Sequence, residues 1–175
     1  MTEIQYLVAP LSRNNIRRMA MYVRKQMGCI DTVYFPVMRF LEHVMPIWRE
    51  GFEWEVVESH ILGTKHAITI PKANKILIRE DVYDGAESGI GRDRATILHE
   101  CFHLLWHADQ MVVMARSFDM KTIKPYRSSE WQAKAFAGEV LVPYHLCKDM
   151  TASQIEVECG VSMDAALYQM GTWKG

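Results

Sequence analysis

Hydrophobic residues in the first third of the chain recur every three or four positions, the spacing of one helix face. The first such face is formed by Ile16, Met19, Ala20, Val23 and Met27. Ser12 can cap this helix and Gly28 can end it. A second helix is expected to begin near Pro36, because proline suits a first helical turn, and to end at Pro46, because proline disrupts a later turn.

The opposite face of the first predicted helix is basic. Its charged residues are Arg13, Arg17, Arg18, Arg24 and Lys25. A basic helix face is usually solvated, and the alternative is that it meets an acidic partner. The spacing alone leaves both interpretations open.

The spacing of hydrophobic residues then changes to alternation, which is typical of strands. Residues 52–58, 66–70 and 75–79 predict three short strands, and Pro71-Lys-Ala-Asn74 predicts a hairpin turn between the second and the third. We expect these strands to form a small antiparallel sheet. Residues 81–92 contain three glycines and predict a loop that leads into the next helix.

Helical spacing returns after this loop. A helix is expected to run to about Ala108, with Asp93 as a candidate N-cap. The following helix opens at Ser128-Ser129, where Ser129 and Gln132 fit a capping box, and it stops at Pro143. Small residues along it predict close packing against another helix.

Length and composition favour one domain with a short tail. A chain of 175 residues buries enough surface to fold without a disulfide or a structural metal. We expect a domain over residues 1–150 and a helical tail over residues 151–175 packed on it. Two short helices joined at Gly160-Val-Ser162 resemble the turn of a helix-turn-helix unit. The second helix has no Arg or Lys to contact DNA, so we expect packing or partner contact rather than direct DNA binding.

Charge, hydropathy and cysteine spacing argue against several classes of protein. A net charge of -1 argues against a strongly cationic nucleic-acid surface. The chain has no apolar run long enough for a membrane span, and its start lacks a signal-peptide pattern. Its 4 cysteines form no CxxC pair and fit reduced, buried thiols better than a disulfide framework. We therefore expect a cytoplasmic protein that does not contact a membrane.

The clearest chemical pattern is the HExxH motif His99-Glu100-Cys101-Phe102-His103 on the third predicted helix. Two histidines four residues apart lie on one helix face, about 5–6 Å apart at Cβ, so both imidazoles can reach one metal ion. In metallopeptidases with this pattern, the glutamate takes a proton from the water that attacks the peptide bond. His99 and His103 are therefore predicted metal ligands, and Glu100 is the predicted catalytic base.

Two further residues are candidates for a third ligand. His107 continues the row of histidines, but eight residues of straight helix span about 12 Å, too far for three nitrogens to meet at about 2.1 Å from one ion. We expect His107 to pack or to support a ligand. Glu130 falls in the first turn of the next helix. It can supply a carboxylate ligand if that helix packs against the motif helix, or it can merely favour a helix N-terminus, and these residues leave both readings open.

Longer stretches of the chain resemble the ImmA/IrrE family of metallopeptidases. They are Ile78-Arg-Glu-Asp-Val-Tyr83, Gly91-Arg-Asp-Arg-Ala-Thr96, His99-Glu-Cys-Phe-His-Leu-Leu-Trp-His107, and Glu130-Trp-Gln-Ala-Lys-Ala-Phe-Ala137 followed by Leu141-Val-Pro143. The resemblance implies a mainly helical α+β fold of the zincin type, with His99, His103 and Glu130 as metal ligands. It also implies that Glu100 is the catalytic residue.

The chain departs from the family pattern at three positions. Phe102 stands where members often have Gly, Lys134 replaces the usual Asn, and Val142 replaces the usual Met. Lys134 can place a cation near the site. None of the three departures removes a ligand.

The resemblance also implies a function, in transcription regulation. Family members with known roles come from bacteria, phages and mobile elements and act on helix-turn-helix repressors, relieving repression. We expect a zinc-dependent endopeptidase, with manganese as the alternative metal, that cleaves an XRE-type repressor of a phage, mobile element or stress regulon. The alternative is a non-cleaving anti-repressor or toxin–antitoxin partner with a vestigial metal site. Tyr126, His107 and His145 are unranked candidates for stabilising the oxyanion.

Overall fold

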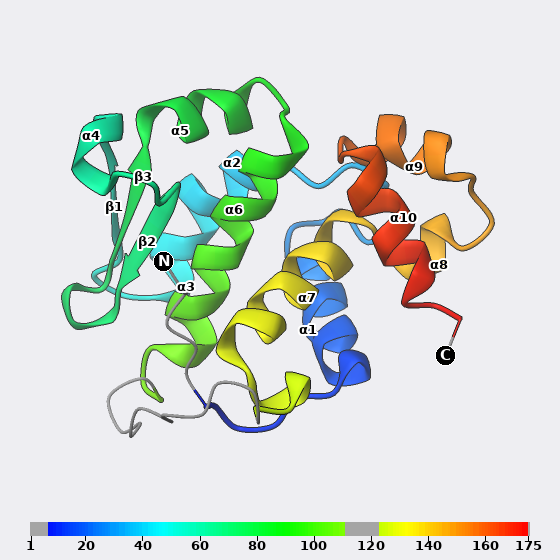
Figure 1. The fold of residues 1–175 in the computed structure, drawn as a ribbon, viewed down its shortest axis with the longest axis horizontal. Coiled ribbons are helices and arrows are strands. Elements are labelled where there is room, and N and C mark those ends of the chain that lie inside the picture. Colours follow the sequence, from blue (N-terminus) through cyan, green and yellow to red (C-terminus); the bar gives the residue numbers. More distant parts are fainter. Residues whose placement is uncertain (1–6, 111–122, 175) are drawn as a thin grey trace.

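The structure, a computed structural model, describes residues 7–110 and 123–174. It is mainly helical, with one small sheet at the edge of the helical body (Figure 1). This confirms the predicted α+β class. Among the described residues, no helix is both long enough and apolar enough to cross a lipid bilayer.

Helix α1 (Arg13–Gln26) begins where the capping pattern predicts. Ser12 Oγ accepts a hydrogen bond from the backbone N–H of Asn15 at 3.1 Å, and the Asn15 side chain accepts one from the backbone N–H of Ser12. The helix packs along α7 (Ser129–Leu141). The residues buried on its inner face are Ile16, Ala20, Val23 and Arg24.

The basic face of α1 is not simply solvated. Arg24 is fully buried. It donates hydrogen bonds to the backbone oxygens of Cys29, Thr32, Val33 and Val140. Arg17 Nε lies 2.8 Å from Oε2 of the buried Glu139 on α7. Part of this face therefore finds its acidic partner within the chain.

The expected end of the second helix at Pro46 is wrong. Helix α2 (Val37–Arg39), a π-helical turn (η1, Phe40–Val44) and α3 (Met45–Trp48) follow one another without a break. The π turn shifts the hydrogen-bond register by one residue immediately before the proline. The proline then occupies the first turn of α3, where its missing N–H is not needed.

The sheet is mixed, so the expected antiparallel arrangement is wrong for one pair of strands. The strands are β1 (Glu53–Val57), β2 (Ala67–Ile70) and β3 (Lys75–Arg79). β2 and β3 form the predicted antiparallel hairpin through the turn η2 (Pro71–Ala73), whereas β1 runs parallel to β3. The order is β1-β3-β2, because α4 (Ser59–Leu62) carries the chain to the far edge before β3 returns through the middle. The central position suits β3, because its two isoleucines are fully buried there.

Residues predicted to form a loop form helix α5 (Glu80–Glu87) instead. One face of this helix is buried through Val82 and Ala86. Gly85, which the sequence pattern marks as a loop residue, allows a close helix contact, since a Cβ there would collide with the carboxylate of Asp93. The glycine therefore serves packing between two helices rather than a turn.

The motif helix consists of α6 (Gly91–Phe102) and a π-helical continuation (η3, His103–His107). Its end lies one residue before the predicted one. The prediction that Asp93 is the N-cap is wrong, because the helix begins two residues earlier and leaves Asp93 buried in its first turn. There the carboxylate accepts a hydrogen bond from Arg92 Nε at 2.8 Å.

Helix α7 is capped by Ser128 rather than by Ser129. Ser128 Oγ accepts a hydrogen bond from the backbone N–H of Trp131 at 3.2 Å. The predicted capping box of Ser129 and Gln132 is therefore wrong, and Gln132 is used elsewhere. The helix ends before Pro143, as the sequence predicts.

The C-terminal helices are α8 (Tyr144–Cys147), α9 (Ala152–Cys159) and α10 (Met163–Gly171). The turn between the last two follows the prediction. Gly160 has a φ of 62°, and Ser162 Oγ accepts a hydrogen bond from the backbone N–H of Ala165 at 3.2 Å. The buried Arg94 of α6 donates to the backbone oxygens of Cys159 and Gly160, so α6 holds this turn. The division of the chain at residue 150 stays a prediction.

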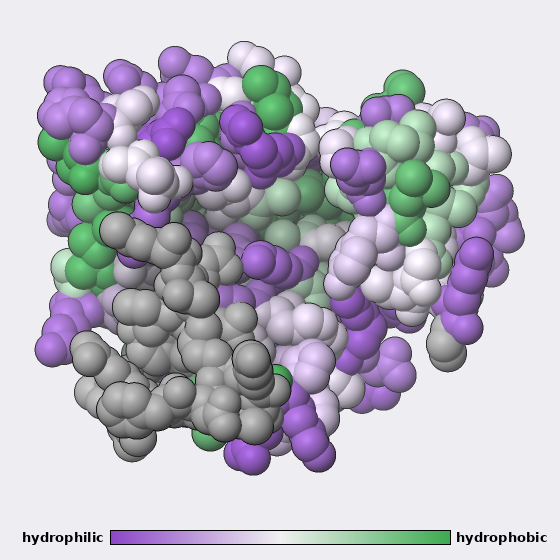
Figure 2. Space-filling view, viewed as in Figure 1, coloured by the Kyte–Doolittle hydropathy of each residue, from purple (hydrophilic) through white to green (hydrophobic). Residues whose placement is uncertain are grey.

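The lobe formed by α9 and α10 carries hydrophobic residues on its surface (Figure 2). Val157, Leu167 and Tyr168 are exposed large hydrophobic side chains on these helices. Helix α10 contains no Arg or Lys. Such a surface suits contact with a protein better than contact with DNA. That a partner protein binds here stays a prediction.

The hydrophobic core lies where α7 packs against α1 and α6, and where α6 packs against the sheet. Its fully buried members include Ile16, Phe40, Ile78, Ile97, Phe102 and Phe136. All four cysteines are buried in this core and none forms a disulfide, in agreement with the predicted thiols.

Candidate metal centre

Two adjacent helices bring the three predicted ligands together. His99 and His103 come from α6 and its π-helical continuation, and Glu130 comes from the first turn of α7. The two histidine Nε2 atoms lie 2.9 Å apart, and each lies 3.1 Å from an oxygen of Glu130. Among residues 7–110 and 123–174, this is the group of His, Cys, Asp and Glu side chains whose spacing suits a metal ion.

Local sequence explains how the three side chains meet. The histidines share one helix face because they are four residues apart. Helix α7 comes close to α6 through small buried residues, Ala133 and Ala137, which follow Glu130 on the same face. The side chains of His99 and Glu130 are each 15% exposed, so water can reach the cluster.

The donor set fits a metal cation. Two ligands that each lie about 2.1 Å from a tetrahedral ion are about 3.4 Å from one another, close to the spacing seen here. Burial raises the pKa of Glu130, but hydrogen bonds and charge from His103 and His99 lower it well below its ordinary value, so the carboxylate is ionised. The geometry meets the requirement for Glu130 as third ligand, and its ligand role stays a prediction.

Glu100 projects toward the sheet and is not part of the cluster of three. The Thr69 hydroxyl of β2 lies 2.7 Å from Glu100 Oε2 and 3.0 Å from the Glu100 backbone oxygen, so it can donate to either. This contact orients the carboxylate that the sequence predicts to be the catalytic base. Sequence reasoning missed Thr69, and its signal was a lone hydroxyl in an otherwise apolar edge strand.

His107 lies behind His103 and outside the cluster, as the helix-length argument predicts. It is fully buried, with its Nδ1 2.9 Å from His103 Nδ1 and its Nε2 2.8 Å from Gln132 Oε1. Burial lowers the pKa of His107 to about 4, so the ring is neutral near pH 7. Gln132 was predicted only as part of a cap, and its contact with His107 depends on a fold that local spacing does not reveal.

The other candidates for stabilising an oxyanion differ in their contacts. His145 Nε2 is engaged with the backbone oxygen of Ile30 at 2.7 Å, and both His107 nitrogens are engaged as well. Tyr126 as a whole residue is 41% exposed. Of the three candidates, Tyr126 is therefore the most exposed residue.

The departures from the family pattern also have structural consequences. The Phe102 ring is fully buried between the rings of Phe136 and His107, with centroids 4.7 and 4.9 Å away. A larger residue than Gly is therefore accommodated as core packing beside the second histidine. Lys134 is exposed on α7, one turn after Glu130, and Val142 is buried.

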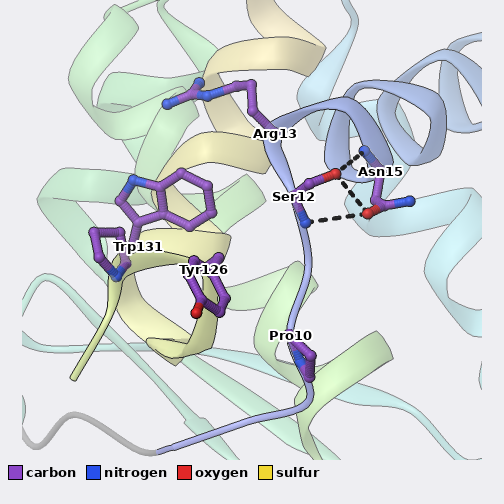
Figure 3. Close-up of a pocket in the computed structure, with 7 residues that line it drawn as sticks. Pro10, Ser12, Arg13, Asn15, Tyr126 and Trp131 are labelled. Carbon is purple, nitrogen blue, oxygen red and sulfur yellow. Dashed lines mark hydrogen bonds between the residues drawn. The ribbon is translucent and has the colours of Figure 1, made fainter.

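A cavity of about 560 Å³ lies between the start of α1 and the start of α7 and shares none of the cluster's residues (Figure 3). Figure 3 shows Tyr126 and Trp131 on one side and the segment from Pro10 to Asn15 on the other. Tyr126 belongs to the short turn η5 (Pro125–Arg127) before α7. The dashed lines join Ser12 and Asn15, which cap α1. Ser12 and Asn15 are thus engaged in the cap, and we assign the cavity no chemistry.

Comparison with known families agrees with the site. Residues 86–170 match the model described as the IrrE N-terminal-like domain, Peptidase_M78. The matched segment contains the histidine motif and Glu130, and it extends through α9 into α10. No curated protein matches the chain.

Proposed function

The chain carries a Peptidase_M78 domain, as its resemblance to the ImmA/IrrE family implies, and from that premise we propose that it is a zinc-dependent endopeptidase. The observation that supports this proposal best is the convergence of His99, His103 and Glu130 at distances suited to one ion. Manganese is the alternative metal, because the same ligands can hold it.

The three ligands would hold the metal and leave one position open. A zinc ion bound there would polarise the substrate carbonyl and lower the pKa of water toward about 7. The low pKa of Glu130 keeps its carboxylate available as a ligand near neutral pH. In this proposal the three side chains are the full set of protein ligands.

Glu100 moves the proton in this mechanism. Thr69 can donate to Oε2 of the carboxylate, which leaves Oε1 to accept a proton from the attacking water. The protonated Glu100 then gives that proton to the leaving amine as the peptide C–N bond breaks. Thr69 keeps the carboxylate aimed during both transfers.

The substrate we propose is an XRE-type helix-turn-helix repressor in the cytoplasm. The support is the family resemblance together with the edge strand β2, which pairs with β3 on one side. An extended peptide segment can pair with the other edge of such a strand and so lie beside Glu100. Cleavage there would relieve repression.

The test is incubation of the zinc-loaded protein with the repressor encoded beside it. We expect one metal ion per chain and two repressor fragments whose masses sum to the repressor plus one water. Glu100→Gln should bind the metal as the wild type does but cleave about 10²–10⁴-fold more slowly, because the base is lost. Glu87→Gln, a matched change at an exposed glutamate of α5, should cleave normally.

Two results would contradict the proposal. A Glu100→Gln variant that cleaves at the wild-type rate would remove Glu100 from the mechanism. An intact repressor in a stable complex with a metal-free protein would instead favour the rival function, a non-cleaving anti-repressor.

A further inference from the structure

A row of hydrogen bonds runs from the backbone to the back of His103. Gln132 is fully buried and its Nε2 donates to the backbone oxygens of Ala9, at 2.8 Å, and Tyr126, at 2.9 Å. Its Oε1 lies 2.8 Å from His107 Nε2. His107 Nδ1 lies 2.9 Å from His103 Nδ1, and His103 Nε2 faces His99 and Glu130.

The direction of each hydrogen bond in this row is determined by its first member. Backbone oxygens only accept, so the amide nitrogen of Gln132 must face them and its oxygen must face His107. That oxygen also only accepts, so His107 carries its proton on Nε2. A neutral His107 then has a lone pair on Nδ1, which accepts a hydrogen bond from His103 Nδ1–H.

We propose that Gln132 and His107 are positioning residues that fix His103 in the Nδ1–H tautomer, so that its Nε2 presents a lone pair to the metal. This inference deepens the proposed function and rests on it. A free imidazole exchanges between two tautomers, and only one of them can bind an ion through Nε2. If His103 carried its proton on Nε2, its Nδ1 lone pair would face the Nδ1 lone pair of His107 inside the core. If His107 then carried its proton on Nδ1 instead, its Nε2 lone pair would face the oxygen of Gln132.

The row also holds the ring orientation. Gln132 is fastened to two segments that precede α7, through Ala9 and Tyr126, so the whole row is tied to the backbone. His103 is only 6% exposed in its side chain, so water cannot easily replace the hydrogen bond that it donates to His107. Groups of this kind behind a ligand typically change metal affinity by about 10–100-fold when they are removed.

Two substitutions of His107 separate this role from simple packing. Asn places an Oδ1 acceptor where histidine has Nδ1, so His107→Asn keeps the bond from His103. Gln places its amide nearer the position of Nε2, so His107→Gln keeps the contact with Gln132 and loses the one with His103. Asn is the smaller residue and leaves the larger cavity, so a packing role predicts that His107→Asn is the more damaging change.

The measurements are zinc affinity by competition with a chromophoric chelator, and thermal unfolding of the metal-free proteins. We expect His107→Asn to unfold at the lower temperature yet bind zinc within about threefold of the wild type, and His107→Gln to bind about 10–100-fold more weakly. Phe136→Leu, which trims a buried ring of the same helix interface, should lower stability without changing affinity. Affinities that follow stability across the three variants would overturn the proposal.

The tautomers can be observed directly in the zinc-loaded protein. Long-range ¹H–¹⁵N spectra of histidine-labelled protein at about pH 8, above the usual histidine pKa, distinguish protonation at Nδ1 from protonation at Nε2. We expect His103 to carry its proton on Nδ1 and His107 on Nε2. A His107 signal protonated on Nδ1 would overturn the tautomer assignment even if the peptidase is active, whereas the expected spectrum from a protein that cleaves no repressor would contradict only the proposed function.

Discussion

The two ends of the motif helix both bury polar side chains, but they arrange donors and acceptors in opposite ways. At the N-terminal end, the buried Arg94 guanidinium donates to three backbone oxygens, those of Phe35, Cys159 and Gly160. One cation of the chain is thus surrounded by acceptors. At the C-terminal end, the three predicted ligands turn their possible metal-binding atoms toward one another. We propose that this cluster takes up a cation from outside the chain.

This difference separates a structural polar group from a functional one. Arg24 repeats the first arrangement, since it is fully buried and donates to the backbone oxygens of Cys29, Val33 and Val140. A buried charge whose partners are complete within the chain holds loops and helix ends in place. Burial alone therefore does not identify a site, whereas convergent acceptors do.

The largest effect that this comparison predicts is a loss of stability when Arg94, at the N-terminal end of the motif helix, is replaced. Arg94→Leu should lower the free energy of unfolding by about 3 kcal/mol or more, because three backbone oxygens lose their donor. A loss of that size corresponds to a fall in Tm of roughly 6–12 °C for a chain of this length. Urea unfolding of the metal-free protein measures it, and zinc stoichiometry should stay at one per chain.

The control for this change is Arg18→Leu, which removes an exposed arginine of α1. Its effect on stability should stay within about 0.5 kcal/mol. If Arg94→Leu lost zinc while keeping its stability, the distinction between the two ends of the helix would be wrong.

A smaller free-energy change, on binding rather than stability, is expected at the other end. Glu130→Gln should weaken zinc binding by at least about 100-fold, since a neutral amide replaces the ionised ligand. The metal-free protein should lose no more than about 1 kcal/mol of stability, the size of a charge effect at a helix N-terminus. Calorimetric titration with zinc measures the first quantity, and Glu158→Gln on α9 is the matched control. Equal zinc affinity in both variants would rule out Glu130 as a ligand.

The features that the sequence predicts well are those that depend on local spacing. The cap of α1 at Ser12 and the two histidines of the motif need only neighbours within four residues. Several of the wrong predictions involve partners beyond that range. Gly85 packs against Asp93, and Gln132 reaches the backbone of Ala9. The direction of β1 likewise depends on which strand occupies the middle of the sheet. Local patterns do not contain these choices.

The smallest effect tests a side chain that belongs to the site but is paired within the chain. Thr69→Val removes the hydroxyl that contacts Glu100 and keeps the shape of a strand residue. Repressor cleavage should slow by about tenfold or less in kcat, with KM and zinc affinity unchanged, because a misaimed base affects proton transfer rather than binding. Thr69→Ser, which keeps the hydroxyl, should restore the rate. A Thr69→Val variant that loses zinc instead would mean that β2 supports the ligands. A side chain that is paired within the chain would then contribute to metal binding, and the distinction between paired groups and converging ligands would fail inside the site.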